Sequence, residues 1–370
     1  MADEMFPVGR PAERDELVDR DEFIEQVATR LFHRNSVILA APRRTGKTSV
    51  AREVLRRLRD RDDAFTAAVD LSAVSSVRQL ADKLTAACLA NAPGLRTLAS
   101  ARENVGRLLR IPEVRARAYD YEIAFEFERE DHGPSPDEAL ERALALPATM
   151  AAKHERLFVI LFDEFQAIRS IGSATVLARM RSVLQLQQRT AFLFLGSQAS
   201  LLASLFGSRQ EPFFRFATWL ALPPVPNEAW RTYIRASLAR QGITIDDAAI
   251  DTILAYTGAH PYDTMQVAFE AYVAAGRRRH IDGGMAMLAC AEAQRKSAPL
   301  FDLEVELAGP RGRAILTRIA QGEPLYAGER SRASISSVLK ELIRTGILLH
   351  VGHGKYQFTE PMLARHLERV

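Results

Sequence analysis

The chain has 370 residues, a length that suits two or three domains rather than one. Apolar residues make up 47% and charged residues 26%, which is ordinary globular composition and excludes a wholly disordered chain. The 49 Lys and Arg against 46 Asp and Glu give a net charge of +3, which by itself indicates no class of partner.

Three features favour a cytoplasmic protein without a membrane partner. The longest apolar runs, such as 157–162 and 191–195, fall far short of the ~18 residues that a spanning helix needs. Residues 1–10 contain no apolar stretch typical of a secretory signal. Cys88 and Cys290 are too few for a disulfide framework or a Cys-rich zinc site.

The first part of the chain alternates short β-like runs with helical patterns, which is typical of a parallel α/β sheet covered on both faces. The runs occupy 36–40, 65–71, 157–163, 191–197 and 219–222. This pattern predicts a core domain over 1–225, interrupted by a long and mostly helical insertion over 96–149.

The strongest motif lies between the first predicted strand and the following helix. Residues 41–48 read Ala-Pro-Arg-Arg-Thr-Gly-Lys-Thr, which supplies inward N–H groups, a lysine for phosphates and a hydroxyl for Mg²⁺. Ala41 stands where glycine is usual, but its methyl group removes no donor, so we expect binding to survive. The predicted nucleotide-binding residues are Pro42, Arg43, Arg44, Thr45, Gly46, Lys47, Thr48 and Ser49, with Thr48 also on the metal.

A second motif ends the third predicted strand. Residues 157–164 form an apolar run that closes on Asp163 and Glu164. Such a strand delivers carboxylates to the carboxyl edge of a parallel sheet, where a phosphate loop also opens. Asp163 is predicted to hold Mg²⁺ through water, and Glu164 to polarise the attacking water. Together the two motifs predict binding and hydrolysis of a nucleoside triphosphate.

These and further segments resemble P-loop ATPases of the AAA+/STAND superfamily, in particular the archaeal-type ATPases with a C-terminal winged helix. The similar segments are the N-terminal box at 6–10, the loop at 42–48, the acidic motif at 163–166, the strand end at 195–197 and the motif at 257–262. The resemblance implies ATP and Mg²⁺, and it implies ATP rather than GTP.

The resemblance also implies roles for residues around the nucleotide. Val8, Gly9 and Arg10 would lie beside the adenine, although a tethered N-terminal loop would look the same. His260 and Pro261 would face the nucleotide, or simply break a helix.

The resemblance implies two further roles, and for each the sequence leaves a purely structural alternative open. Ser197, or its neighbour Gln198, would contact the γ-phosphate or the water as sensor 1, or else cap the next helix. Arg215 would act as an arginine finger toward a second copy in a homo-oligomer, or else be a surface arginine beside a phenylalanine cluster.

Prolines at 223, 224 and 226 predict a domain boundary. Helical patterns over 226–299 indicate a lid domain, with breaks near Gly242, Gly258 and Gly283. Over 300–370, two helical patterns precede β-like runs at 347–351 and 355–359, the order of a winged helix-turn-helix. Residues 310–370 carry ten Lys and Arg against five Glu, a net +5.

The predicted recognition helix has a buried stripe of Ile335, Val338, Leu339, Leu342 and Ile343. Its outward face and the wing give a candidate DNA surface of Arg332, Ser336, Lys340, Arg344 and Lys355, with Glu341 opposing. The leading hypothesis is an ATP-driven switch or motor on duplex DNA. The alternative is a signalling NTPase whose winged helix docks a protein; the 96–149 insertion could also meet a protein partner.

Overall fold

The computed structural model describes residues 5–90, 114–119, 122–127, 134–172, 174–325, 332–352 and 354–368. They form two compact units that interleave along the chain. The sheet unit comprises Glu22–Ala40 and Val50–Ala221. The helical unit comprises Met1–Asp21, Ala41–Ser49 and Leu222–Val370, so the phosphate-loop segment belongs to it.

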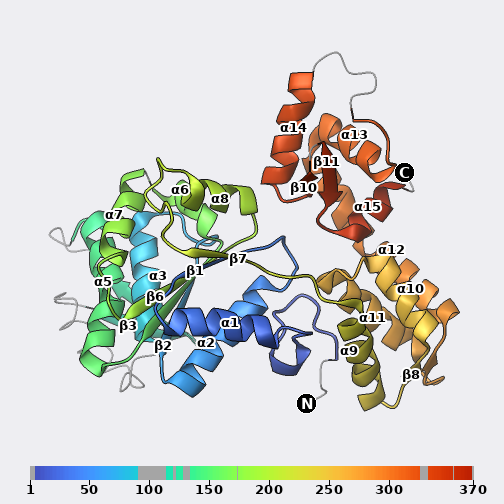
Figure 1. Cartoon of the computed structure of the whole chain (residues 1–370), viewed down its shortest axis with the longest axis horizontal. Helices are drawn as coiled ribbons and strands as arrows, with labels where there is room; N and C mark the ends of the chain where they lie inside the picture. Colours follow the sequence, from blue (N-terminus) through green and yellow to red (C-terminus); the bar gives the residue numbers. More distant parts are fainter. Residues whose placement is uncertain are drawn as a thin grey trace. The chain divides into compact units, whose positions relative to one another are not determined.

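The sheet unit is built on five parallel strands in the order β2-β5-β6-β1-β7 (Figure 1). Each strand lies within one residue of its predicted bounds, so the predicted α/β fold class is confirmed. The strands are β1 (Val37–Ala40), β2 (Phe65–Asp70), β5 (Phe158–Asp163), β6 (Thr190–Gly196) and β7 (Thr218–Ala221).

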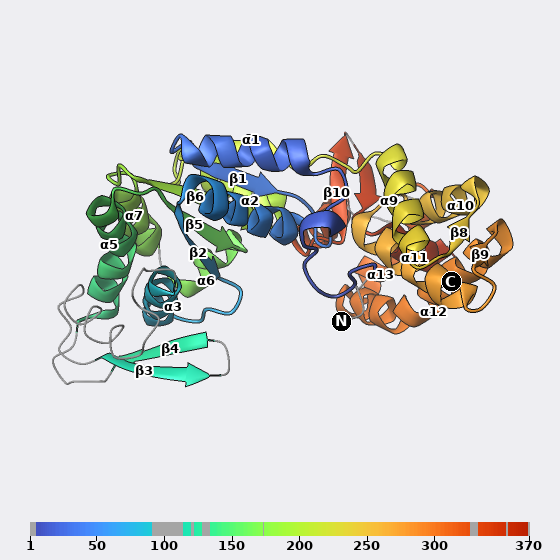
Figure 2. The same ribbon diagram turned by 90° about the horizontal axis from the view of Figure 1, so that it is seen from below.

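Both faces of this sheet are buried, which is why its strands are continuous apolar runs. On one face, the hydrophobic core formed with the helices includes Ile38, Ile160 and Phe194. Side chains of neighbouring strand residues point to the other face, and there Leu39, Leu161 and Leu193 are equally buried. Figure 2 shows α1 and α3 on opposite sides of the sheet. The helices are α1 (Asp21–Phe32), α2 (Lys47–Asp62), α3 (Val77–Leu89), α5 (Pro136–His154), α6 (Ile168–Ile171), α7 (Ala174–Leu184) and α8 (Ala199–Gly207).

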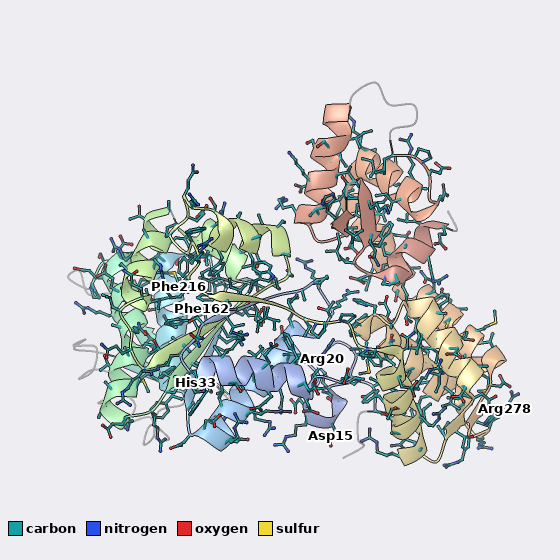
Figure 3. The ribbon with its side chains drawn as sticks, viewed as in Figure 1. Asp15, Arg20, His33, Phe162, Phe216 and Arg278 are labelled. Atoms are coloured by element: carbon teal, nitrogen blue, oxygen red, sulfur yellow. The ribbon has the colours of Figure 1, made fainter. Side chains whose placement is uncertain are left out.

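An aromatic cluster fills the core at the end of β5 and β6. Phe165, in the 3₁₀ turn η2 (Phe165–Ala167), lies 4.7 Å between ring centres from Phe194 and 5.3 Å from Phe213. Phe162 and Phe216, both labelled in Figure 3, extend the cluster along the sheet. This packing anchors the turn that follows β5.

The prediction of a mostly helical insertion over 96–149 is corrected in part. Residues 91–113 lie outside the described residues, but β3 (Val114–Tyr119) and β4 (Glu122–Phe127) pair as an antiparallel hairpin beside α3 (Figure 2). Charged and apolar residues alternate in both strands, the period of an extended chain rather than of a helix. The helical part is α5, which Ser135 caps by accepting a bond from the N–H of Glu138.

The helical unit contains the helices predicted for the lid. Gly242 and Gly258 each lie between two of them, and Gly283 begins the last. The helices are α9 (Asn227–Arg240), α10 (Asp247–Thr257), α11 (Pro261–Ala275) and α12 (Gly283–Leu307). The short strands β8 (Thr244–Ile245) and β9 (His280–Ile281) pair between them. The N-terminal segment belongs to the same unit: Phe6 is buried against Tyr233, and Arg20 donates to the carbonyl of Pro223 at 2.7 Å.

The predicted boundary between 299 and 300 falls inside α12, which continues to Leu307 through Pro299. A proline in a helix removes one hydrogen bond without necessarily ending the helix. The remainder of the three-domain division stays a prediction.

After α12 the chain forms what we name the C-terminal module, from α13 to α15. Its elements are α13 (Gly309–Ala320), α14 (Arg332–Arg344), β10 (Leu348–Gly352), β11 (Lys355–Phe358) and α15 (Pro361–Glu368). The strands form an antiparallel pair, so the predicted helix–helix–hairpin order is present. Ile335, Leu339 and Leu342 of α14 are buried, as the stripe predicts.

Cys88 and Cys290 are buried and free. Within the described ranges, no helix combines the length and apolar character needed to cross a membrane.

Candidate functional site

The loop between β1 and α2 has the backbone of a phosphate cradle. Gly46 has a φ of +93°, and no atom lies within 4 Å of the position where a Cβ would stand. The backbone of Arg44 is also in the left-handed region, with a φ of +62°, whereas the φ of Ala41 is not positive. The position of Ala41 therefore has no conformational need for glycine, which agrees with the expectation that alanine is tolerated there.

Lys47 is the first residue of α2, so the loop opens on the N-terminal N–H groups of a helix. Its buried ammonium donates to the carbonyl of Pro42 at 2.8 Å, and the Thr45 hydroxyl donates to the same carbonyl at 2.7 Å. These two bonds close the loop. Ser49 accepts a bond from the N–H of Ala12 at 2.9 Å, so its hydroxyl ties the N-terminal segment to the start of α2.

Arg44 extends from the loop to two other parts of the helical unit. Its Nη1 lies 2.7 Å from Glu360 Oε2, and its guanidinium stacks 4.6 Å from the ring centre of Tyr262. Glu360 directly precedes α15, and Tyr262 lies in the first turn of α11. One arginine of the phosphate loop therefore touches both the lid helices and the C-terminal module. Arg43 beside it is exposed.

Arg44 lies near acids that are buried, as Glu360 and Asp263 are, or half-buried, as Glu304 is. Burial raises the pKa of Glu360, the charge of Arg44 opposes this, and Asp263 and Glu304 raise it further. Burial likewise raises the pKa of Glu304, against the charges of Arg44 and Arg43. The phosphate loop thus supplies the positive charge that keeps these acids compatible with burial.

His260 stands at the start of α11 with its ring buried. Neither Nδ1 nor Nε2 has a hydrogen-bond partner, and Nδ1 lies 3.5 Å from Asp263 Oδ1. Trp230 fixes the preceding turn by donating to the carbonyl of Ala259 at 3.1 Å. Pro261 is the first residue of α11, a position that suits proline. An unpartnered buried imidazole is a group that a ligand can satisfy.

The N-terminal box is also defined. Gly9 has a φ of +82°, and Val8 is 38% exposed. Arg10 makes a two-bond pair with Glu16, at 2.8 and 2.6 Å. Its guanidinium is thereby committed to the adjoining turn η1 (Arg14–Glu16), and the adenine role of Val8, Gly9 and Arg10 stays a prediction.

The carboxyl edge of the sheet carries the acidic pair. Asp163 ends β5, and Glu164 follows in a left-handed conformation, with φ +48° and ψ +46°. The Ser197 hydroxyl, just after β6, donates to Glu164 Oε2 at 2.8 Å, and Gln166 Nε2 donates to the same oxygen. The structure therefore brings Glu164 and Ser197 together, a contact that the sequence did not predict; the sensor role of Ser197 stays a prediction. Gln166, to which the sequence had assigned no role, completes the set.

Gly196 explains why this arrangement needs a small residue. A Cβ there would lie 2.3 Å from Gln166 Oε1 and 2.6 Å from Leu202 Cδ1. The close approach of β6 to the turn after β5 places Ser197 within reach of Glu164.

Arg215 lies at the other edge of the same sheet. It precedes β7 by three residues, is exposed and left-handed at φ +52°, and stacks on Phe214 at 5.2 Å. β7 is parallel to β1, so Arg215 is at the amino edge, whereas Glu164 is at the carboxyl edge. A role for Arg215 in hydrolysis consequently requires a second copy.

The predicted DNA face lies on α14 and the hairpin. Ser336, Lys340 and Lys355 are exposed. Arg344 is exposed too, but its Nε donates to Glu341 at 2.7 Å, which neutralises it locally. Arg332 is the first residue of α14, and its side chain lies outside the described residues.

No model of a known protein family matches the chain, and no curated protein matches it in sequence. Solved structures do match. A Walker-type ATPase of Pyrococcus abyssi aligns with a TM-score of 0.72 over 99% of this chain and 100% of that one, at 16% identity. The ORC2 protein of Aeropyrum pernix, in ADPNP and ADP complexes, aligns at 0.59 over 99% and 97%, at 14% identity. The ORC1 protein of the same organism, in complex with DNA, aligns at 0.52 over 96% and 94%, at 15% identity.

The chain has the AAA+ P-loop fold. At these identities the likeness establishes the fold, and function has to be argued from the residues of this chain.

The acids around Arg44 predict a pH dependence of stability. Above 4.5, the ordinary value for Glu360, the unfolded chain releases a proton that the folded chain still binds, because the folded pKa is raised. The free energy of unfolding should therefore fall as pH rises from 4.5 toward that raised pKa. Glu360→Gln should flatten this fall, measured by denaturant unfolding over a pH series.

The matched control is Glu323→Gln, which removes an exposed acid outside the group. It should keep the wild-type slope. An unchanged slope in Glu360→Gln would contradict the assignment, since Glu304 alone would then account for the whole dependence.

Proposed function

We propose that this chain binds and hydrolyses ATP with Mg²⁺, and that the nucleotide state controls how its C-terminal module contacts duplex DNA. The observation that carries the proposal is the position of Arg44. It belongs to the phosphate loop, yet it is bonded to Glu360 beside α15 and stacked on Tyr262 of α11. A change at the phosphates therefore has a direct route to both elements.

The residues present suit a bound nucleotide. Gly46 leaves open space above a left-handed backbone, Lys47 brings an ammonium into the loop, and α2 presents its first N–H groups. His260 offers two unpartnered ring nitrogens in the same unit. We infer that the phosphates lie on the loop and that His260 and Pro261 face the base or ribose.

The hydroxyl of Thr48 and the carboxylate of Asp163 are oxygen donors of the type that Mg²⁺ takes. The ion would neutralise charge on the phosphate oxygens when bound. β1 and β5 are parallel strands of one sheet, so the carboxyl end of β1 and Asp163 at the carboxyl end of β5 share one edge of that sheet.

Glu164 is the proposed general base for water, and Ser197 and Gln166 are its positioning residues. Three donors reach the same carboxylate oxygen of Glu164: the amide of Gln166, the hydroxyl of Ser197 and, at 3.4 Å, the backbone N–H of Ser197. They fix the orientation of the carboxylate and leave its other oxygen to act as the base. A left-handed residue at this turn is typical of a functional position that the surrounding packing must hold. Arg215 would then act on the nucleotide of a second copy in a homo-oligomer.

We infer that phosphate groups compete with Glu360 for Arg44. An oxyanion beside the loop attracts the guanidinium, and Glu360 then loses the charge that compensates its burial. The ion pair is thus weakened when the phosphates are in place, and α15 is freed to move with its module.

The DNA partner is supported by the surface of the module. Lys340 and Lys355 are exposed on α14 and β11, and the helix–helix–hairpin order is that of a winged helix. The structure of ORC1, whose fold is similar, is a complex with DNA. We propose that α14 enters a groove and that the hairpin contacts phosphates.

Two observations favour the alternative, a regulatory NTPase whose module docks a protein. Glu341 neutralises Arg344 in the middle of the face, and Val351 of β10 is 56% exposed. Such a face is less basic and more apolar than DNA requires.

Steady-state ATP turnover with and without duplex DNA at low salt tests the proposal. We expect DNA to stimulate the wild type, and Lys47→Ala to lose nucleotide binding because the loop loses its ammonium. Glu164→Gln should keep binding but lose at least about 100-fold in kcat, as expected for a general base. Basal turnover that ignores DNA would move the assignment to the protein-docking alternative.

Ser197→Ala tests the positioning of Glu164. Loss of a hydrogen bond to a charged group should lower kcat by about 10- to 100-fold and leave ATP affinity within about twofold. The control is Ser182→Ala, whose hydroxyl bonds to the carbonyl of Arg179 on the exposed side of α7. A loss of affinity without a loss of kcat would instead make Ser197 a phosphate ligand.

Lys340→Glu tests the DNA face. Charge reversal at an exposed phosphate contact should weaken duplex binding about tenfold or more at low salt and reduce the slope of log Kd against log salt by about one. Lys153→Glu, an equal charge change at an exposed position of α5, is the control. Equal affinities of the two variants would remove α14 from the DNA interface.

A further inference from the structure

Three carboxylates of the helical unit lie around the guanidinium of Arg44. Glu360, just before α15, contacts it directly, with Oε2 and Nη1 2.7 Å apart. Asp263 lies in the first turn of α11 and Glu304 near the end of α12, and both repel a further negative charge at Glu360. The arginines that oppose this charge belong to the phosphate loop: Arg44 acts on Glu360 and Glu304, and Arg43 acts on Glu304.

His260 is the remaining titratable group beside these acids. Its Nδ1 lies 3.5 Å from Asp263 Oδ1, and the other oxygen of Asp263 accepts the N–H of Met362 at 3.3 Å. In the part of the chain that the structure describes, no ion pair joins His260 to Glu360. Asp263 therefore has a hydrogen bond and an imidazole beside it, whereas Glu360 depends on Arg44.

The carboxylate of Glu360 is buried and has one bonding partner. Its side chain is 8% exposed, and among the described residues the guanidinium of Arg44 is the one side-chain group that bonds to it. A buried carboxylate that loses its cation is not resolvated in place, and it becomes neutral by binding a proton. Protonation of Glu360 is thus the expected response to loss of Arg44.

Arg44 is the mobile member of the pair. Its side chain is 39% exposed, and it extends from the loop on which, in the proposed function, the phosphates of ATP lie. Oxygens of a phosphate form strong charge-assisted bonds with a guanidinium and compete for it with a single carboxylate oxygen. The inference below rests on that proposed function.

We propose that binding of ATP draws Arg44 away from Glu360 and that Glu360 takes up a proton from solvent in exchange, so that acidity favours the nucleotide-bound chain. The proton binds a carboxylate oxygen of Glu360, which becomes a neutral carboxyl group, and no other bond is made or broken by this step. The charges in the folded chain agree with this direction. Burial raises the pKa of Glu360 even while Arg44 opposes it, and removal of that opposing charge raises the pKa further.

The coupling between proton and nucleotide has a definite sign. Between the pKa of Glu360 in the free chain and its higher pKa in the ATP complex, the complex binds a proton that the free chain does not. ATP affinity therefore rises as pH falls through this interval, by up to about tenfold per pH unit for one proton. Outside the interval, Glu360 contributes no pH dependence to binding.

The experiment is calorimetric titration of the full chain with a non-hydrolysable ATP analogue and Mg²⁺, in buffers of different ionisation enthalpy, over a pH series above 4.5. The difference in heat between buffers gives the number of protons taken up per nucleotide bound. We expect the wild type to take up more protons than Glu360→Gln, by up to about one, and to gain affinity on acidification relative to that variant. Ionisation of the nucleotide itself is common to both chains and cancels in this difference.

Glu323→Gln, which removes an exposed acid outside the group, is the matched control and should take up as many protons as the wild type. In Arg44→Gln, Glu360 has no cation to lose, so proton uptake should equal that of Glu360→Gln. Equal uptake by the wild type and Glu360→Gln, with the analogue bound, would overturn the inference and place the proton on Glu304, His260 or the nucleotide, while the proposed ATP site would stand. Absence of binding by the wild type at every pH would overturn the proposed function, and this inference with it.

Discussion

The position of β6 between β5 and β1 is the constraint on which the site depends. Parallel pairing on both sides of β6 sends the carboxyl ends of all three strands to one edge. That edge receives the phosphate-loop strand, the acidic pair and Ser197 from segments far apart in the sequence. Gly196 then lets β6 approach the turn after β5 closely enough for the Ser197 hydroxyl to reach Glu164. Orientation of the proposed base is therefore a consequence of strand order and one missing Cβ.

The strands and the two motifs could be predicted because they are local. Buried parallel strands are apolar runs, and a Gly-Lys-Thr at a strand–helix junction has a meaning that needs no distant partner. The β3–β4 hairpin was missed although Glu-Ile-Ala-Phe-Glu-Phe in β4 alternates with period two, a signal present in the sequence. The domain boundary predicted between 299 and 300 falls inside α12, because the helical pattern continues through Pro299 to Leu307.

The contacts that orient side chains could not be read in the same way. Arg44 and Glu360 are 316 residues apart, and neither position by itself favours the other as a partner. Arg44 had no predicted role beyond the loop, since loop arginines commonly point to solvent. Gln166 is a similar case, because its bond to Glu164 depends on the left-handed turn after β5. Side-chain pairing across a fold follows from tertiary geometry, which composition and periodicity do not contain.

The Arg44–Glu360 pair has a strength that suits the proposed switch. The Glu360 side chain is 8% exposed and the Arg44 side chain is 39% exposed. Exposed ion pairs contribute about 0–1 kcal/mol to stability, and breaking a buried ion pair costs about 3–5 kcal/mol. The free energy of this half-buried pair should lie between these two values. A value of about 1–3 kcal/mol corresponds to a coupling of roughly 5- to 150-fold. A stronger pair would hold α15 whatever the nucleotide, and a weaker one would transmit nothing. Because Arg44 is partly exposed, a phosphate group can compete for it and break the contact. Because Glu360 is buried, breaking the contact leaves its carboxylate without the charge that compensates its burial.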